Sequence, residues 1–294
     1  MTENKFTGTG VALITPFRKD GSIDFNSLEK LVEHQISNGV DYLVVMGTTG
    51  EAATLTKDER LAVINYVAEV NNKRVPMVVG AGGNNTQEVV DRIKTYEGTE
   101  SIDAILSVAP YYNKPNQKGI FLHYKTIAAA SPVPIILYNV PGRTGVNISA
   151  ETTLKIAHEV DNVVAIKEAS GNLEQIMEIL RDKPEHFKVI SGDDALTFPM
   201  LTLGASGVIS VVANAFPADF SEMVRLTLNN DLTGARAKHF KLLEIIQNLF
   251  VEGNPAGVKA VLDIMNIGPN YLRLPLTPVS RTLYNKLAKL VENY

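Results

Sequence analysis

The sequence predicts an α/β protein that folds as a (β/α)8 TIM barrel with a C-terminal helical extension. Strand-like apolar runs recur roughly every 20–35 residues, and a helical pattern follows each one, which is the spacing of βα units. Most runs are almost continuously apolar, as parallel strands covered on both faces are. A chain of 294 residues is long enough for one such barrel. A doubly wound open sheet is the structural alternative.

Eight runs qualify as strands. They span residues 11–15, 42–46, 76–80, 104–108, 134–139, 163–167, 187–191 and 207–211. Each is short and rich in β-branched residues, and turn residues bound it. Eight βα units are the number that closes a TIM barrel.

Capping residues mark where several helices begin. Thr56 and Glu59 have the spacing of a capping box, in which each side chain bonds the other's backbone amide. Asn172 and Gln175 repeat that spacing. Further N-cap candidates are Asp24, Thr86 and Ser149.

The pattern stays helical from residue 217 to the C-terminus, with no strand left to assign. We therefore expect residues 1–216 to form the barrel that carries the active site. Residues 217–294 would form a helical region packed on that barrel.

Charge and composition exclude several classes of protein. The net charge of −4 gives no electrostatic reason to bind nucleic acid or an anionic membrane. The absence of cysteine excludes disulfides and thiolate sites. No uncharged apolar run approaches the roughly 18 residues of a membrane span, and residues 1–5 lack the apolar core of a signal peptide. We predict a soluble cytoplasmic protein.

Lys167 is the most informative residue, because it closes the apolar run 163–167. A side chain at the C-terminal end of a buried parallel strand points into the mouth of the barrel. Burial disfavours the charged form of lysine and favours the nucleophilic amine that forms a Schiff base with a carbonyl. Taken alone, Lys167 could also be a surface lysine whose charged end reaches solvent.

Polar residues and glycines gather after five expected strands, where TIM barrels place their active sites. These stretches are residues 47–51, 110–113, 138–145, 167–168 and 191–194. Singly, each has an ordinary structural interpretation, such as a surface arginine at Arg143 or a helix cap at Asp193. Together they bring a nucleophile, phenols, hydroxyls and an arginine to one opening. That combination favours a site for a carbonyl and a carboxylate.

The sequence indicates neither a metal nor a cofactor. The five histidines are scattered and lack the spacing of metal ligands. The glycine-rich stretch 80–84 lacks the third glycine and the acidic partner of a dinucleotide loop. We predict that the protein needs no external cofactor and no catalytic metal.

Three motifs resemble the 4-hydroxy-tetrahydrodipicolinate synthase family, formerly called dihydrodipicolinate synthases. They are Gly-Thr-Thr-Gly-Glu at 47–51, Tyr-Asn-Val-Pro-Gly-Arg-Thr-Gly at 138–145 and Ile-Lys-Glu-Ala at 166–169. The resemblance runs from residues 10–17 to residues 273–278. Within the pyruvate-dependent Schiff-base superfamily, the loop that holds Arg143 is most particular to this family.

The resemblance implies a lyase that condenses pyruvate with L-aspartate 4-semialdehyde. Its product would be 4-hydroxy-tetrahydrodipicolinate, on the diaminopimelate route to lysine. Members of the family are usually homotetramers built as a dimer of dimers, so we expect at least a dimer here.

The same resemblance assigns the catalytic residues. Lys167 looks like the Schiff-base lysine, and Tyr138 like the general acid/base beside it. Thr49 and Tyr112 look like the other members of a proton relay with Tyr138. In the family the residue that matches Tyr112 enters from the neighbouring subunit.

The substrate-binding residues also follow from the resemblance. Thr48 and Thr49 look like the pocket for the carboxylate of pyruvate, with Gly192 nearby and a backbone contact from Ile209. Arg143 looks like the anchor for the carboxylate of the semialdehyde. A guanidinium can bind a carboxylate through two hydrogen bonds, so lysine would replace it poorly.

Some family members are inhibited by lysine at a subunit interface. The matching positions are Ala52, Lys57, Arg60, Asn84, Glu88 and Tyr111. Lys57 and Arg60 place positive charge where a cationic ligand would bind, which lowers its affinity. We therefore expect weak or absent inhibition by lysine. If both side chains point to solvent, they matter little.

Two other functions compete with this interpretation. One is a different pyruvate-dependent aldolase, such as N-acetylneuraminate lyase or a 2-keto-3-deoxy-sugar acid aldolase; the Thr48–Thr49 pair and Arg143 argue against it. The other is a catalytically silent keto-acid binder; an intact set of Lys167, Tyr138, Thr49 and Tyr112 argues against that one.

Overall fold

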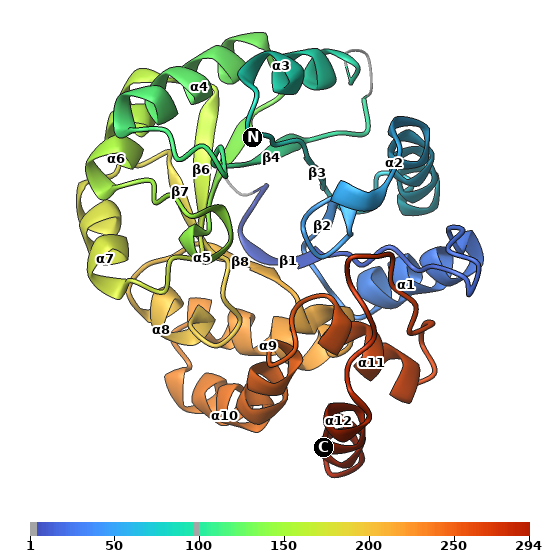
Figure 1. The fold of residues 1–294 in the computed structure, drawn as a ribbon. Coiled ribbons are helices and arrows are strands. Elements are labelled where there is room, and N and C mark those ends of the chain that lie inside the picture. Colours follow the sequence, from blue (N-terminus) through green and yellow to red (C-terminus); the bar gives the residue numbers. More distant parts are fainter. Residues whose placement is uncertain (1–4, 97–99) are drawn as a thin grey trace.

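Eight parallel strands form one closed barrel in the order β1 to β8 in the computed structural model, which describes residues 5–96 and 100–294. Figure 1 shows the helices as a ring around them. The predicted (β/α)8 barrel is confirmed, because β1 pairs with β8 and leaves no open edge. Residues 1–4, which were part of the argument against a signal peptide, lie outside the described residues.

The strands are β1 (Gly8–Ala12), β2 (Tyr42–Val45), β3 (Met77–Gly80), β4 (Ala104–Val108), β5 (Ile135–Asn139), β6 (Val163–Glu168), β7 (Lys188–Ser191) and β8 (Gly207–Ser210). All but the first lie within one residue of their predicted bounds. The prediction for β1 was wrong by three residues, because a glycine-rich stretch does not look like a strand. Gly10 is needed there, since a Cβ at this position would lie 2.2 Å from the ring of Tyr42 inside the barrel.

The ring of helices follows the strands in chain order. It comprises α1 (Phe25–Ser37), α2 (Lys57–Asn71), α3 (Thr86–Lys94), α4 (Gln117–Ala130), α6 (Ala150–Glu159), α7 (Leu173–Asp182), α8 (Thr197–Thr202) and α9 (Pro217–Leu228). Short helical turns interrupt three loops, at η1 (Ala52–Thr54), α5 (Pro141–Thr144) and η2 (Val212–Asn214). Beyond the ring lie α10 (Leu232–Leu249), α11 (Ala256–Ile264) and α12 (Arg281–Glu292).

Most of the predicted helix starts are confirmed. The confirmed N-caps are Asp24, Thr56, Ser149 and Asn172, and Thr56 completes its capping box. Thr86 is not a cap, because Asn85 accepts the amide bond instead. The second capping box was also wrong, since the side chain of Gln175 turns inward and donates to Glu168 at 2.9 Å. A buried carboxylate attracts this amide more strongly than the helix terminus does.

The C-terminal region packs on the barrel around one buried ion pair. Lys259 in α11 and Glu51, in the loop after β2, bond each other, and both side chains are fully buried. Lys259 also donates to the carbonyl of Tyr271 at 2.8 Å, and the amide of Arg273 donates to Glu51 at 3.1 Å. Burial lowers the pKa of Lys259 to about 8, against the opposing pull of Glu51.

The division after residue 216 stays a prediction. The helix that begins there, α9, follows β8 after the short turn η2 and packs on β1, as the eighth helix of a βα ring does. Figure 1 shows α11 and α12 beyond the ring. The segment between them bonds the loops after β1 and β2, since the Arg273 side chain donates to the carbonyls of Gly21 and Thr54.

Replacing Lys259 by methionine tests how strongly the buried pair holds the extension. Loss of one partner leaves a buried carboxylate uncompensated, so we expect Lys259→Met to lower the free energy of unfolding by about 3–5 kcal/mol. Lys155, whose exposed side chain pairs with Glu159, is the matched control, and Lys155→Met should cost less than about 1 kcal/mol. Urea unfolding measures both, and equal losses would contradict the assignment.

Candidate active site

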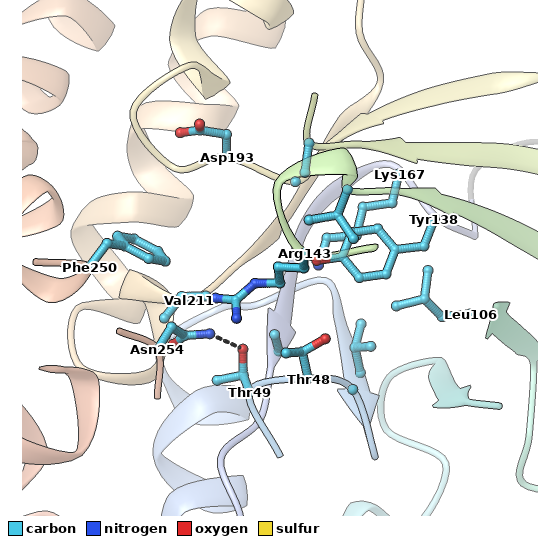
Figure 2. Close-up of a pocket in the computed structure, with 16 residues that line it drawn as sticks. Thr48, Thr49, Leu106, Tyr138, Arg143, Lys167, Asp193, Val211, Phe250 and Asn254 are labelled. Atoms are coloured by element: carbon cyan, nitrogen blue, oxygen red, sulfur yellow. Dashed lines mark hydrogen bonds between the residues drawn. The ribbon is translucent and has the colours of Figure 1, made fainter. Parts of the chain in front are cut away.

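Lys167 and Tyr138 lie side by side at the carboxyl ends of β6 and β5. The parallel register pairs Tyr138 with Lys167, so both side chains leave their strands at the same level. The two residues are buried, with 6% and 7% of their surface exposed, and the Lys167 Nζ lies 4.3 Å from the centroid of the Tyr138 ring. Figure 2 shows both reaching into one cavity.

This cavity has a volume of about 190 Å³. Six of the predicted site residues line it together: Thr48, Thr49, Tyr138, Arg143, Lys167 and Gly192. Apolar side chains complete its walls, among them Ala12, Val44 and Leu106. A space of this size holds a small acid of a few carbon atoms beside the amine of Lys167.

Gly192 lies against the aliphatic chain of Lys167. A Cβ at residue 192 would be 2.9 Å from the Lys167 Cε and 2.8 Å from the Cβ of Ala169. The position therefore needs glycine, because any side chain would push the lysine out of its place. The contact with Lys167 is therefore enough to account for glycine at residue 192, whether or not Gly192 contacts a substrate.

The two threonines after β2 differ in their surroundings. The Thr49 hydroxyl is buried, with 3% of the residue exposed, and accepts a hydrogen bond from the Asn254 Nδ2 at 2.9 Å. Thr48 is exposed to the cavity, and Figure 2 shows its hydroxyl directed toward the side of Tyr138. The turn between them and Glu51 is closed by backbone bonds from Gly50 to Gly47 and from Glu51 to Thr48.

Arg143 stands on the short helix α5, directly after β5. Figure 2 shows its guanidinium extending across the cavity toward Asn254 and Val211. A buried network holds this loop to β6: Asn139 donates to the Glu168 carboxylate at 2.6 Å, and its Oδ1 accepts from the amide of Ile148 at 3.0 Å. The residue after Lys167 thus fixes the loop that carries the arginine.

Asp194 holds the loop after β8 beside the cavity. Its buried carboxylate accepts from the amides of Val211 and Val212 at 3.1 and 2.8 Å. Burial raises its pKa to about 6, although these hydrogen bonds favour the ionised form. Since Val211 lines the cavity, Asp194 shapes that wall without contacting the space itself.

Two predicted site residues lie outside this cavity. Tyr112 is 83% exposed and does not line the cavity in this single chain. Ile209 is buried inside the barrel, and Val211 is the nearby lining residue that follows β8. Their predicted roles, a relay member from a neighbouring subunit and a backbone contact, stay predictions.

A second cavity, of about 550 Å³, adjoins the first and shares Thr48, Tyr138 and Arg143 with it. Five of the six residues predicted for lysine binding line it: Ala52, Arg60, Asn84, Glu88 and Tyr111. The sixth, Lys57, lines a smaller hollow of about 280 Å³, together with Arg60 and Glu88. The predicted set therefore gathers around two adjacent spaces.

Among the lining residues that sequence reasoning missed are Val211, Phe250 and Asn254. The last two come from the C-terminal region, more than 80 residues beyond Lys167 in the chain. The run Gly253-Asn254-Pro255 before α11 was the available signal, because such a run marks a loop. Nothing in the local pattern says that this stretch folds back over the barrel mouth.

The described residues hold no group of three His, Cys, Asp or Glu side chains that could bind a metal ion. In residues 5–96 and 100–294, no helix is long and apolar enough to cross a membrane.

Comparison with known proteins decides the family. The model of the dihydrodipicolinate synthetase family matches residues 5–294. The chain belongs to this family. A curated 4-hydroxy-tetrahydrodipicolinate synthase from Parabacteroides distasonis is 55% identical over 291 residues, which cover 99% of this chain and 98% of the relative. The predicted family and the enzyme class, a lyase, are confirmed, and the sugar-acid aldolases and N-acetylneuraminate lyase are not favoured.

Solved structures of dihydrodipicolinate synthases agree with the fold. The chloride-inhibited enzyme from Acinetobacter baumannii, in complex with pyruvate, is 41% identical with a TM-score of 0.95, and 98% of each chain is covered. A monomeric dihydrodipicolinate synthase variant is 40% identical with a TM-score of 0.95, covering 98% of this chain and 96% of the variant.

A lysine titration tests the second cavity. Arg60 lines it and Lys57 lies in the adjoining hollow, so their positive charges should repel a cationic ligand. We expect sub-millimolar L-lysine to leave the initial rate nearly unchanged, and the double variant Lys57→Ala/Arg60→Ala to be more sensitive. Strong inhibition of the unmodified chain in that range would contradict the prediction.

Proposed function

We propose that this member of the dihydrodipicolinate synthetase family condenses pyruvate with L-aspartate 4-semialdehyde through a Schiff base at Lys167. The product is 4-hydroxy-tetrahydrodipicolinate, in the diaminopimelate route to lysine. The observation that carries the proposal is the buried Lys167 amine beside the Tyr138 ring, in a cavity sized for a keto acid. The A. baumannii relative bound to pyruvate supports the choice of keto acid.

The first half of the reaction activates pyruvate. The Lys167 amine attacks the keto carbon and a C–N bond forms. The keto oxygen takes one proton from the amine and one from an acid, and leaves as water. The resulting iminium draws electrons from the methyl group, which loses a proton to give the enamine. The carboxylate of pyruvate is held at the turn that carries Thr48 and Thr49.

Proton transfer falls to Tyr138, which stands beside the Lys167 amine. The family resemblance assigns Thr49 and Tyr112 to the same relay. We instead favour Thr48 as the hydroxyl next to Tyr138, because the Thr49 hydroxyl already accepts a bond from Asn254 and turns toward it. The Thr49 hydroxyl then binds the carboxylate of pyruvate. A hydroxyl suits either task, since it donates and accepts at once.

The second half joins the two substrates. Arg143 binds the carboxylate of the semialdehyde and directs its aldehyde carbon to the enamine. A carbon–carbon bond forms, and the aldehyde oxygen takes up a proton. The amine of the semialdehyde then attacks the iminium carbon, closes the ring and releases Lys167. None of these steps uses an external cofactor.

We further propose a cytoplasmic homotetramer built as a dimer of dimers. The largely exposed ring of Tyr112 supports an assembly in which a neighbouring subunit contributes this residue to the cavity. A similar solved structure is that of a monomeric variant, so the number of subunits has to be measured. Analytical ultracentrifugation, at the protein concentration used in the activity assay, gives the number of subunits directly.

The test of the proposed function is a coupled substrate assay. Purified protein is supplied with pyruvate and L-aspartate 4-semialdehyde, and the product is identified by mass. The proposal predicts loss of pyruvate and a cyclised product that requires both substrates. Consumption of pyruvate only with sugar-derived aldehydes would contradict it.

Tyr138→Phe tests the assigned acid/base residue. We expect kcat to fall by roughly 10²–10⁴-fold, the usual contribution of a positioned proton donor or acceptor. Tyr284→Phe is the matched control, because the Tyr284 hydroxyl donates to the Asp263 carboxylate at 2.7 Å and neither residue lines the cavity. A kcat near the unmodified value in Tyr138→Phe would remove Tyr138 from the mechanism.

Arg143→Lys tests recognition of the second substrate. The ammonium cannot reproduce two parallel hydrogen bonds, so we expect the KM of the semialdehyde to rise more than tenfold. The KM of pyruvate should change less than threefold, and Arg181→Lys, on an exposed arginine outside the cavity, should change neither. Equal increases in both KM values would argue against the role given to Arg143.

A further inference from the structure

The C-terminal region reaches the active-site cavity through one polar contact. The Asn254 Nδ2 donates to the Thr49 hydroxyl oxygen at 2.9 Å, and both residues are buried. The dashed line in Figure 2 marks this bond at the edge of the cavity, next to the Arg143 guanidinium. Within the described residues it is the only hydrogen bond of the Asn254 side chain, whose Oδ1 has no partner.

The direction of this bond has a chemical consequence. A threonine hydroxyl has one proton and two lone pairs. Because Asn254 donates to one lone pair, the Thr49 proton is directed away from Asn254 and stays available to an acceptor in the cavity. A hydroxyl without such a partner could instead turn its proton toward a nearby backbone carbonyl.

The backbone around both residues is held firmly. Glu51, two residues after Thr49, bonds Lys259, which lies five residues after Asn254. Arg273 adds a bond from its amide to Glu51 and one from its side chain to the carbonyl of Thr54. Met46 and Glu51 bracket the turn with positive φ angles of 60° and 51°, a conformation that persists only where the surroundings enforce it.

We propose that Asn254 is a positioning residue for keto-acid recognition, which fixes the Thr49 hydroxyl as a donor to the carboxylate of pyruvate. The inference rests on the proposed function, because it takes pyruvate as the occupant of the cavity. It assigns to the C-terminal region a direct part in substrate binding, beyond packing on the barrel. Lys259, through Glu51, holds the two partners at bonding distance.

A double-mutant cycle on pyruvate alone tests this role. Exchange of the pyruvate methyl protons for deuterium follows enamine formation and needs no semialdehyde. Its rate as a function of pyruvate concentration gives a half-saturating concentration. We expect Thr49→Val to raise that concentration about tenfold, as loss of a hydrogen bond to a charged group does, and Asn254→Leu to raise it severalfold.

The decisive variant combines both changes. If Asn254 acts through the Thr49 hydroxyl, Thr49→Val/Asn254→Leu should match Thr49→Val within about twofold, because the hydroxyl to be oriented is already gone. Fold-changes that multiply would overturn the proposal. Asn248→Leu is the matched control. Asn248 is buried in α10, donates to the carbonyl of Glu244 and does not line the cavity, so the change should leave half-saturation unchanged.

A second variant, Asn254→Asp, tests the same role if Asn254→Leu does not fold. The carboxylate has the same size, but it accepts from the Thr49 hydroxyl instead of donating, and so draws the proton out of the cavity. We expect half-saturation to rise at least as much as in Asn254→Leu; an unchanged value would overturn the proposal. Absence of exchange in the unmodified enzyme would instead contradict the proposed function itself.

Discussion

The structure depends on a buried amine that a substrate can still reach. The closed barrel meets this constraint by placing Lys167 at the end of β6, level with Tyr138 on β5, through a fixed parallel register. Apolar side chains fill the barrel beneath, Gly192 leaves room for the lysine chain, and the loops after the strands enclose a small cavity above. A shift of either strand by one residue would turn one of the two side chains to the opposite face.

The loops that complete the site are fixed by buried polar networks. Glu168, next to Lys167, holds the Arg143 loop through Asn139, and the ion pair of Glu51 with Lys259 holds the Thr48–Thr49 turn to the C-terminal region. Each network joins segments that are distant in the chain, and Glu51 and Lys259 are 208 positions apart. Buried charges of this kind add little net stability when they form, but they exclude arrangements that would leave one of them unpaired.

Local patterns predicted most of the fold and much of the candidate site. Apolar runs predicted seven of the eight strands, because buried parallel strands leave a strong signal. The first strand, β1, was misplaced, because Gly8 and Gly10 are required by close contacts with Asp41 and Tyr42. The stretches after the predicted strands contain six residues that line the cavity together, since the carboxyl ends of the strands meet at one face of a barrel. Asn254 and the inward turn of Gln175 were missed, because both depend on contacts that only tertiary packing creates.

Borohydride trapping with pyruvate tests the central claim most directly. The enzyme is reduced in the presence of pyruvate, digested, and searched for a modified lysine by mass. Lys167 should carry the reduced adduct, and Lys167→Arg should carry none. Lys259 is the sharpest comparison, because it is also buried but engaged by Glu51 and a backbone carbonyl. An adduct on Lys259, or none on Lys167, would contradict the account.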